Sequence, residues 1–315
     1  MCDIWQRVDA REISAASLIR HRDSLIHLGV RQVVLSGGEP LLNRDLPAIL
    51  DFFRALGIRV TLLTTGLLLQ KRAALLVDGV DDIVVSLDGP PAIHDAIRRV
   101  PRAFDTIARG IEAIRSLRPT MPIACRTTVQ KQNHFHLQAT VDAAHSVELD
   151  SISFLPVDLT SIAFNREQPW ASGRQDEVAL TVTELAALEL ELERLIANYR
   201  LDISTRFIRE NEMKLRHLAT RFREHLTGSP PRSPKCNAPW VSTVMDVDGT
   251  LRPCFFHPPV ALTTELTLEQ ALNSPTARAF RSNLDIASDR ICQRCVCSLN
   301  YQAETSLSRA ATEGS

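Results

Sequence analysis

Short apolar runs rich in β-branched residues alternate, over the first half of the chain, with longer segments whose apolar residues recur at helical spacing. The pattern predicts strands at residues 33–35, 58–63, 83–87, 123–129 and 152–155. Between them it predicts helices at residues 46–56, 68–77, 104–117 and 137–147. Repeated β-α units of this kind build a parallel sheet with helices on its faces, so the sequence indicates an α/β fold.

One more helix precedes the first predicted strand. It opens at Ser14, and Leu18, Ile19, Leu25 and Ile26 form its apolar side. No strand pattern comes before this helix, so the sheet is expected to have an unpaired edge where a first strand belongs. We therefore expect the β-α series to begin upstream of residue 1.

The second half of the chain is less regular. Residues 156–175 form a long loop, which in an α/β domain is typical of a binding loop or a lid; its candidate substrate contacts are Asp158, Asn165 and Trp170. Helices are predicted at residues 183–199 and 207–225, followed by a linker rich in glycine, serine and proline. The expected organisation is a core domain over residues 1–227, a linker over 228–235 and a second domain over 236–315.

The composition is that of a folded protein with little charge bias. The 315 residues include 36 basic and 37 acidic ones, for a formal net charge of -1, and 44% of the residues are hydrophobic. This composition excludes a disordered chain and argues against electrostatic binding of nucleic acid. No run approaches the ~20 apolar residues of a membrane span, and the first twenty residues lack the apolar run of a signal peptide. We expect a cytoplasmic protein that binds neither nucleic acid nor membranes.

Glycines and polar residues follow four of the predicted strands. The run Gly37-Gly38-Glu39-Pro40 comes directly after the first strand, where two glycines allow a ligand to approach the backbone closely. Ligands of parallel α/β folds bind at the carboxyl ends of the strands. The polar residues at the later strand ends suit a ligand with hydroxyl, amine and carboxylate groups: Thr64, Thr65, Ser86, Asp88, Arg126 and Thr128.

Five of the seven cysteines lie after residue 235. Cys236 and Cys254 flank a tight turn, and Cys292 and Cys295 form a C-x2-C pair. Four thiolates brought together by a hairpin and a knuckle suit either zinc or an iron–sulfur cluster, and the spacing does not separate the two. Cys297 is either a spare ligand or a bystander.

The remaining two cysteines need separate explanations. Cys125 lies in an apolar strand, where a free thiol behaves as a small core side chain. Cys2 stands at the start of the chain, in the run Cys2-Asp3-Ile4-Trp5.

The first half of the chain resembles the radical S-adenosylmethionine (radical SAM) enzymes. Cys2 resembles the third cysteine of their C-x3-C-x2-C motif, which holds the radical-generating [4Fe–4S] cluster, and the GGEP run resembles the motif that binds the methionine amino group. Ser86 and Asp88 resemble the strand that meets the ribose, and Arg126 resembles the residue that steadies the methionyl carboxylate. Thr64-Thr65-Gly66 stands where the family has Thr-Asn-Gly. The resemblance thus implies cofactor contacts from Gly37, Gly38, Glu39, Pro40, Thr64, Ser86, Asp88 and Arg126.

The tail resembles the start of the SPASM pattern of a subgroup of these enzymes. Cys236, Gly249-x4-Cys254 and the C-x2-C pair match it, but the later SPASM cysteines are absent, so one auxiliary cluster of Twitch type is expected. The resemblance implies the metal ligands Cys2, Cys236, Cys254, Cys292 and Cys295.

The resemblance implies a partial (β/α)6 barrel, without its first strand here, followed by a small cysteine-rich SPASM/Twitch-like domain. It implies an enzyme that reductively cleaves S-adenosylmethionine, forming a 5′-deoxyadenosyl radical that abstracts hydrogen from a peptide or cofactor-precursor substrate. The implied cofactors are S-adenosylmethionine, the radical-site [4Fe–4S] cluster and an auxiliary iron–sulfur cluster. The implied electron donor is a protein such as flavodoxin or ferredoxin.

The first two cluster cysteines of the family would lie before Met1. The absence of these two cysteines and the absence of a first strand both indicate that the sequence starts at an internal methionine of a longer protein. As printed, the chain is expected to be inactive in reductive cleavage. The alternative is a non-catalytic α/β binding or scaffold protein with a structural four-cysteine zinc site, and metal content separates the two readings.

Overall fold

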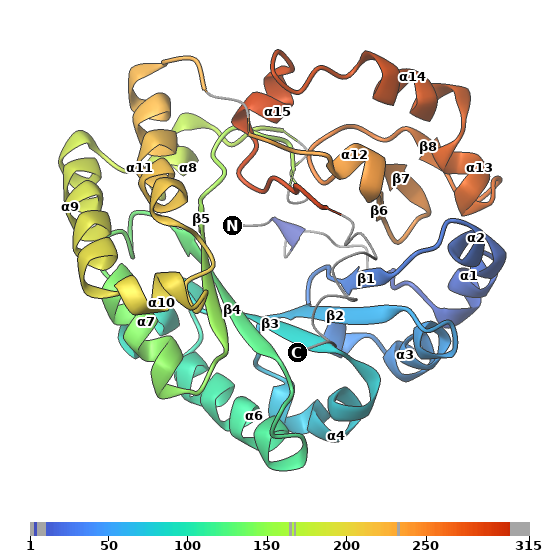
Figure 1. Cartoon of the computed structure of the whole chain (residues 1–315), viewed down its shortest axis with the longest axis horizontal. Helices are drawn as coiled ribbons and strands as arrows, with labels where there is room; N and C mark the ends of the chain where they lie inside the picture. The colour runs from blue at the N-terminus through green and yellow to red at the C-terminus, as the bar shows by residue number, and fades with distance from the viewer. Residues whose placement is uncertain (1–2, 5–10, 164–165, 167, 232–233, 303–315) are drawn as a thin grey trace, which may run out of the picture.

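Five parallel strands form a single curved sheet in the computed structural model, with the strands in chain order across the sheet (Figure 1). The structure describes residues 3–4, 11–163, 166, 168–231 and 234–302. The strands are β1 (Gln32–Leu35), β2 (Arg59–Thr64), β3 (Asp82–Ser86), β4 (Ile123–Val129) and β5 (Ser151–Pro156). Each lies within one residue of the boundaries predicted from the hydrophobic pattern. The predicted α/β class with a parallel sheet is confirmed.

Helices cover the convex face of this sheet (Figure 1). They are α3 (Leu46–Ala55), α4 (Leu69–Gly79), α6 (Ala103–Leu117) and α7 (Leu137–Ser146), all close to their predicted positions. Strand β4 shows why the sheet has two different faces: its buried side chains alternate with the exposed Arg126 and the half-buried Thr128. Cys125 is among the buried ones, 1% exposed, as expected for a core thiol. The exposed polar groups of β4 therefore lie on the face turned away from these helices.

Two short helices precede β1 and one follows β3. Helix α1 (Ala15–Ile19) is capped by Ser14, and α2 (Arg22–His27) follows it. Helix α5 (Pro91–Arg98) lies after β3, and the 3-10 turn η2 (Pro40–Leu42) lies after β1. Within the described residues β1 pairs with β2 alone, so β1 forms one edge of the sheet.

The opposite edge differs from the prediction. Residues 207–209, expected at the start of a helix, run alongside β5 instead, and Ile208 forms a parallel bridge with Ile152. The amide of Ile152 donates to the Phe207 carbonyl at 2.7 Å, and the amide of Arg209 donates to the Ile152 carbonyl at 2.9 Å. Pairing with a free strand edge therefore overrides the local helical pattern. The described strands form an open sheet, with no closed barrel among them.

Helices α8 to α11 follow β5 and line one side of the molecule (Figure 1). Their bounds are α8 (Ser172–Asp176), α9 (Val182–Asn198), α10 (Arg200–Ser204) and α11 (Glu212–Thr227). Helix α9 begins with a capping box between Thr181 and Glu184, and α11 begins at Asn211, whose side chain accepts from the amide of Lys214. Helices α9 and α11 pack on each other.

The C-terminal region faces the open side of the sheet (Figure 1). Its elements are α12 (Ala238–Val241), β6 (Val244–Met245), β7 (Thr250–Arg252), β8 (Ala261–Leu262), α13 (Leu268–Leu272), α14 (Pro275–Asn283) and α15 (Arg290–Arg294). The three strands form an antiparallel sheet, and the predicted tight turn is present, with Gly249 at φ 81. Helix α13 packs on α2, and Arg20 Nη2 donates to the Thr264 carbonyl at 2.8 Å. The first helices of the chain therefore support the last domain.

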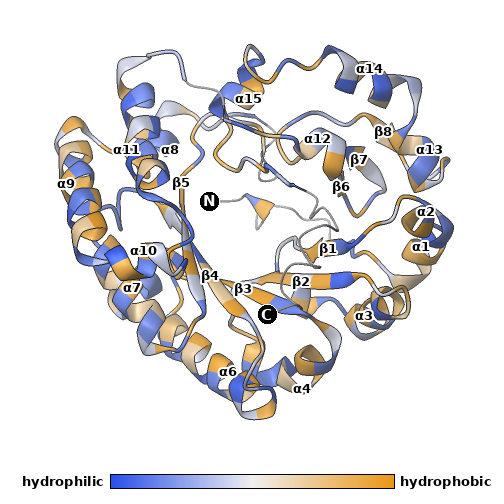
Figure 2. Ribbon diagram, in the orientation of Figure 1, coloured by the Kyte–Doolittle hydropathy of each residue, from blue (hydrophilic) through white to orange (hydrophobic). Residues whose placement is uncertain are grey.

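Hydropathy separates the two parts of the molecule (Figure 2). The central strands are strongly apolar, whereas the C-terminal elements are short and mixed in character. No described helix combines the length and the apolar character that a bilayer span requires. The domain boundaries at residues 227 and 236 stay a prediction; α11 ends there at Gly228, which adopts the left-handed conformation.

Candidate functional site

The turn after β1 is tied to the end of β2 through a single carboxylate. Glu39 Oε1 accepts from Thr64 Oγ1 at 2.8 Å and from the amide of Leu41 at 3.2 Å. Glu39 Oε2 accepts from the amide of Thr65 at 2.8 Å and from its hydroxyl. Gly37, at φ 140, supplies a conformation that a side chain would disfavour. The predicted GGEP residues and Thr64 are therefore brought together by the fold.

One of the four donors to Glu39 can be exchanged for a ligand. A carboxylate has about four acceptor sites, and all of them are used here. The two backbone amides are fixed and the Thr65 hydroxyl positions Oε2 together with its own amide, but the Thr64 hydroxyl can turn its proton away and leave room for an incoming ammonium group. Thr65 also explains the departure from Thr-Asn-Gly, since its hydroxyl and its amide both hold Glu39. The geometry suits the binding of an amine.

The start of the chain lies against this turn. A Cβ placed on Gly38 would lie 3.7 Å from Ile4 Cδ1, so the Ile4 side chain covers that glycine. Cys2, two residues earlier, lies outside the described residues. Its predicted role as a cluster ligand stays a prediction.

Asp88 is buried and engaged with the protein. Its side chain is 4% exposed and forms an ion pair with Arg98, at 2.6 Å between Oδ2 and Nη2. Asp88 Oδ1 accepts from the amide of Thr128 at 3.2 Å, and the Asp88 amide donates to His94 Nδ1 at 3.2 Å. Asn133 Nδ2 donates to the Asp88 carbonyl at 2.8 Å. These contacts join the ends of β3 and β4, so Asp88 positions the strand ends, and its predicted ribose contact stays a prediction.

Arg126 and Ser86 lie on the open face of the sheet. Their Cα atoms are partners in the register of β3 and β4. The Arg126 side chain is exposed, and its Nε lies 3.4 Å from Ser153 Oγ on β5. An exposed guanidinium on this polar face is suited to a carboxylate ligand.

Glu210 is a residue of this face that the sequence pattern missed, because residues 207–225 were expected to be helical. Its Oε2 accepts from the amide of Phe154 at 3.1 Å. Burial raises the pKa of the Glu210 carboxyl, while the charges of Lys214 and Arg126 act in the opposite direction. A half-buried acid therefore lies within the electrostatic field of Arg126.

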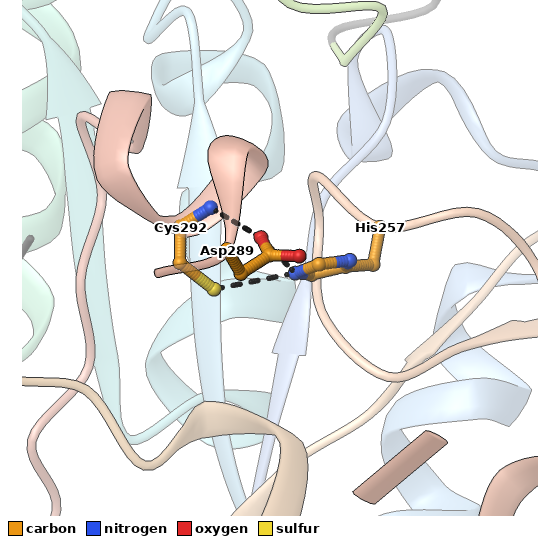
Figure 3. Close-up of side chains that lie close together, drawn as sticks. All are labelled: His257, Asp289 and Cys292. Carbon is orange, nitrogen blue, oxygen red and sulfur yellow. Dashed lines mark hydrogen bonds and ion pairs between the residues drawn. The ribbon is translucent and has the colours of Figure 1, made fainter. Parts of the chain in front are cut away.

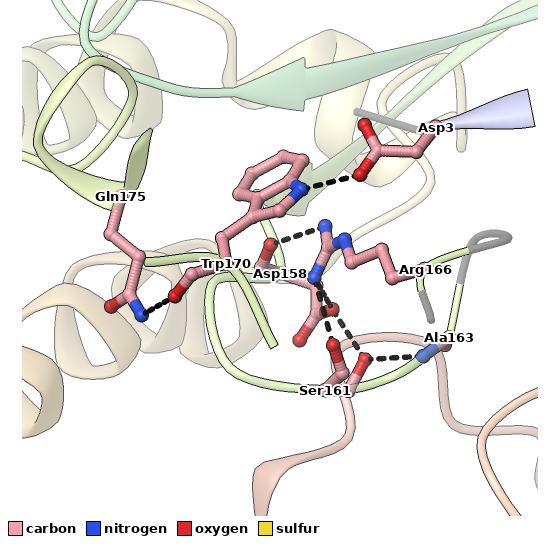
Figure 4. Close-up of polar contacts among 7 residues, drawn as sticks. All are labelled: Asp3, Asp158, Ser161, Ala163, Arg166, Trp170 and Gln175. Atoms are coloured by element: carbon pink, nitrogen blue, oxygen red, sulfur yellow. Dashed lines mark hydrogen bonds and ion pairs between the residues drawn. The ribbon is translucent and has the colours of Figure 1, made fainter. Parts of the chain in front are cut away.

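The loop at residues 156–175 is held by a buried ion pair (Figure 4). Arg166 Nη1 lies 2.7 Å from Asp158 Oδ2, and Arg166 stacks over the Trp170 ring at 3.7 Å from its centroid. Trp170 Nε1 donates to Asp3 Oδ2 at 2.7 Å. Asp158 and Trp170 thus anchor the loop to itself and to the start of the chain, whereas Asn165 lies outside the described residues.

The four predicted metal-binding cysteines of the tail lie near enough to influence one another's charge, although no three of their sulfurs lie within 4.8 Å of one another in the part of the chain that the structure describes. Cys254 lies within the electrostatic influence of Cys236, and Cys292 within that of Cys254 and Cys295. Cys295 is influenced by Cys236, Cys254 and Cys297. Burial, strengthened by the neighbouring sulfurs, raises the pKa of the Cys295 thiol to about 12. Burial and then the Asp289 carboxylate raise the pKa of the Cys292 thiol, with smaller effects from the neighbouring sulfurs. Such a set of thiols fits a cation, which reverses this shift and favours the thiolates.

Hydrogen bonds to sulfur and to the knuckle backbone prepare this site. The amides of Phe256 and His257 donate to the Cys254 sulfur, and the amide of Cys297 donates to Cys295 Sγ at 3.3 Å. Arg221 of α11 donates from Nη1 to the Gln293 carbonyl at 2.6 Å and from Nη2 to the Cys295 carbonyl at 3.1 Å. The helix that ends the core domain therefore holds the C-x2-C knuckle in place.

His257 and Asp289 also lie at this site, and neither was predicted (Figure 3). The liganding atoms of His257, Asp289 and Cys292 all lie within 4.8 Å of one another. The nearest signal in the sequence is the position of His257, three residues after Cys254. Nothing in the spacing connects it with Cys292.

Two family models match the chain. Residues 1–142 match the Radical SAM superfamily, and residues 236–296 match SPASM, an iron-sulfur cluster-binding domain. Residues 1–142 therefore form a radical SAM domain, and residues 236–296 form a SPASM domain. The resemblance inferred from the GGEP run and the tail cysteines is confirmed, and the radical SAM and SPASM domains imply S-adenosylmethionine and [4Fe–4S] clusters as cofactors.

Curated relatives of this chain include enzymes of two kinds. An AdoMet-dependent heme synthase of Methanosarcina barkeri is 33% identical over 150 residues, which cover 47% of this chain and 42% of the relative. A probable GTP 3′,8-cyclase of Sulfolobus acidocaldarius is 32% identical over 145 residues, covering 44% and 46% of the two chains. The aligned region thus spans less than half the length of each of these relatives.

Solved structures share the fold of this chain. Native anSMEcpe with bound AdoMet has a TM-score of 0.63 at 16% identity, covering 89% of this chain and 78% of that one. Streptococcus suis SuiB bound to the precursor peptide SuiA has a TM-score of 0.58 at 18% identity, with coverages of 90% and 64%. At these identities the likeness shows the fold alone.

Proposed function

We propose that this protein is a radical SAM enzyme of the cytoplasm that reductively cleaves S-adenosylmethionine and abstracts hydrogen from a peptide or cofactor-precursor substrate. The observation that carries the proposal is the Glu39 carboxylate, held at the ends of β1 and β2 by two amides and two hydroxyls. This arrangement suits the amino group of S-adenosylmethionine within a chain that matches both family models.

The residues of this chain fit the parts of the ligand in turn. Glu39 and Thr64 take the ammonium group, and Gly37, Gly38 and Pro40 shape the turn around it. Arg126 pairs with the carboxylate, and Ser86 and Asp88 lie at the strand end expected near the ribose. The two glycines allow close approach of the ligand to the backbone. When bound, S-adenosylmethionine and a [4Fe–4S] cluster supply the radical. The protein binds and orients the substrate and keeps water out of the site.

The radical-site cluster is a different case. Cys2 is the only cysteine of the sequence before Cys125, and the family motif holds this cluster with three cysteines. A three-thiolate site is not completed by Cys2 alone. Cys2 could therefore supply one of the three thiolates that this cluster needs.

The substrate class is a peptide or a cofactor precursor. Relatives bear the names of heme synthases, and SuiB, which shares the fold, is bound to a precursor peptide. The four-cysteine tail is proposed to hold one auxiliary iron–sulfur cluster, with Cys236, Cys254, Cys292 and Cys295 as its ligands. A flavodoxin or ferredoxin is proposed as the electron donor.

The test is to restore the three-cysteine motif. The printed chain is expressed with an added N-terminal segment that places cysteines three and seven residues before Cys2, and is purified and reconstituted without oxygen. With dithionite, this protein is expected to form 5′-deoxyadenosine from S-adenosylmethionine. The same extension with alanines in place of both cysteines is the matched control and is expected to form none.

Two results would contradict the proposal. One is the absence of 5′-deoxyadenosine from the extended protein although iron and acid-labile sulfide are fully present. The other is zinc in the tail with no visible absorbance, which supports the scaffold alternative instead.

A further inference from the structure

His257 is a buried histidine whose ring faces a cluster-ligand sulfur. The residue is 3% exposed, and its Nε2 lies 3.3 Å from Cys292 Sγ and 3.6 Å from Asp289 Oδ1 (Figure 3). The ring of Phe280 packs edge-on against the imidazole, at 4.9 Å between centroids. The ring is therefore held in one orientation by packing and by polar contacts.

The neighbours of Nε2 determine where the proton lies. A metal-bound Cys292 is a thiolate, which accepts hydrogen bonds and donates none. The carboxylate of Asp289 is likewise an acceptor. Facing two acceptors, Nε2 carries the proton of the imidazole, and it points this proton at sulfur.

Asp289 stabilises the backbone of the knuckle rather than the Cys292 sulfur. Its Oδ1 accepts from the amides of Ile291 at 3.0 Å and of Cys292 at 2.8 Å, so it caps the first turn of α15. This carboxylate is used in fixing the backbone of the C-x2-C knuckle. The Asp289 carboxylate also lies near the Cys292 sulfur, but it can only accept a hydrogen bond, so His257 is the one of these side chains that can donate to a thiolate.

We propose that His257 donates a hydrogen bond from Nε2 to the Cys292 thiolate and thereby raises the reduction potential of the auxiliary iron–sulfur cluster. The proposal rests on the auxiliary cluster of the proposed function. Reduction adds negative charge to a cluster and its sulfurs, and a donor to sulfur stabilises that charge. His257 is thus a positioning and tuning residue that acts through Cys292.

The sulfur of Cys292 differs from those of Cys254 and Cys295 in the kind of hydrogen-bond donor that it faces. The sulfurs of Cys254 and Cys295 accept from backbone amides, which side-chain substitution does not remove. The donor to Cys292 is a side chain, so its contribution can be removed while the four cysteines and their backbone contacts stay in place. The auxiliary potential is therefore adjustable at this one position without a change of ligand.

The test uses the full printed chain, reconstituted with iron and sulfide, and two variants. His257→Phe keeps an aromatic ring against Phe280 and removes the donor, whereas His257→Gln keeps an N–H group at a similar distance from the backbone. The readouts are iron and sulfide content and the midpoint potential of the cluster in a redox titration followed by electron paramagnetic resonance. Neither depends on cleavage of S-adenosylmethionine.

His257→Phe is expected to keep its cluster and to show a more negative midpoint potential. The expected change is about a tenfold lower equilibrium constant for one-electron reduction, which equals about 59 mV. The midpoint potential of His257→Gln is expected to lie close to that of the unaltered protein. An unchanged potential in a fully loaded Phe variant overturns the proposal.

A second measurement on the unaltered protein covers the case in which the Phe variant does not load. Electron–nuclear double resonance of the reduced cluster is expected to show an exchangeable proton that is weakly coupled to the electron spin. The signal of this proton is expected to disappear in deuterium oxide. A strong nitrogen coupling would instead make His257 a ligand and overturn the donor role. Failure of the proposed function shows separately, as missing 5′-deoxyadenosine, and zinc in place of iron overturns both the auxiliary cluster and the role of His257.

Discussion

The strand-end site and the cysteine site of this protein are assembled in different ways. At the strand ends, Glu39 and Asp88 already have protein partners, and the strands beneath them belong to a large apolar core. In the C-terminal region, the strands have two or three residues and few apolar side chains are fully enclosed. The first site is preorganised by hydrophobic packing, whereas the second brings thiols together that resist ionisation.

This difference shows what stabilises each of the two sites. A carboxylate with four donors costs little to keep in place before a ligand arrives. Buried thiols close to one another, such as Cys295 with its pKa raised to about 12, favour their protonated forms until a cation is bound. The C-terminal region is therefore expected to depend on its metal, and the core domain is not.

The sharpest test of this contrast is loss of the tail metal. Cys295→Ala is expected to remove the auxiliary metal and to abolish amide protection throughout residues 236–302, while β2 to β5 keep theirs. Structural metal sites contribute on the order of 10 kcal/mol, which exceeds what this small region gains from packing. Hydrogen exchange followed by mass spectrometry measures both regions in one sample.

Cys297→Ala is the matched control for the metal experiment. Cys297 is exposed, and its contact with Cys295 Sγ comes from its backbone amide, which alanine retains. Protection is expected to stay as in the unaltered chain. Retained metal and protection in Cys295→Ala would show that Cys295 is not a ligand and that the region folds by packing alone.

A medium-sized effect is expected from His94 on the core-domain side. The residue is 1% exposed; burial, followed by the nearby Arg98, lowers the pKa of His94 to about 4, although Asp88 and Asp95 oppose this. The unfolded chain takes up a proton near pH 6.5, whereas the folded chain does so only near pH 4. Stability is therefore fully present above pH 6.5 and falls by about 3 kcal/mol as the pH drops to 4.

Denaturant unfolding of the core domain across this pH range measures the effect. His94→Asn, which keeps an acceptor near the Asp88 amide, is expected to be less stable at every pH and to lose most of this dependence between pH 6.5 and 4. An equal slope in the variant would assign the dependence to other groups.

The smallest effect tests the hydroxyl of Thr65 that positions Glu39. Thr65→Ala removes one hydroxyl that positions the carboxylate, and it is expected to weaken binding of S-adenosylmethionine about tenfold, or ~1.4 kcal/mol. Thr65→Ser keeps the hydroxyl and is expected to bind as the unaltered chain does. Equilibrium dialysis measures both, and equal affinity in all three proteins would show that the Thr65 hydroxyl does not position Glu39 for binding.

Local periodicity explains why the sheet could be predicted. Each strand is a run of β-branched and apolar residues, and the helices between the strands have apolar residues on one face only. The strand at residues 123–129 was predicted with the bounds that the structure has. The GGEP turn could be predicted as well, because its residues are adjacent in the chain. The tail cysteines were predicted as a group by residue type and spacing.

Contacts between distant residues explain what the sequence pattern missed. Residues 207–209 follow the edge of β5 rather than their helical pattern, and this placement brings Glu210 to Phe154. His257 meets Cys292 only because a loop after β7 folds against α15. Each of these depends on tertiary packing that leaves no periodic signal.

The hydrogen bond from Trp170 to Asp3 has a consequence for synthesis on the ribosome. Its two partners are 167 residues apart, so the start of the chain emerges long before its anchor exists. At about 5–20 residues per second, the delay is on the order of ten to thirty seconds. The segment beside Cys2 therefore gains this anchor only after the strands of the sheet have been made.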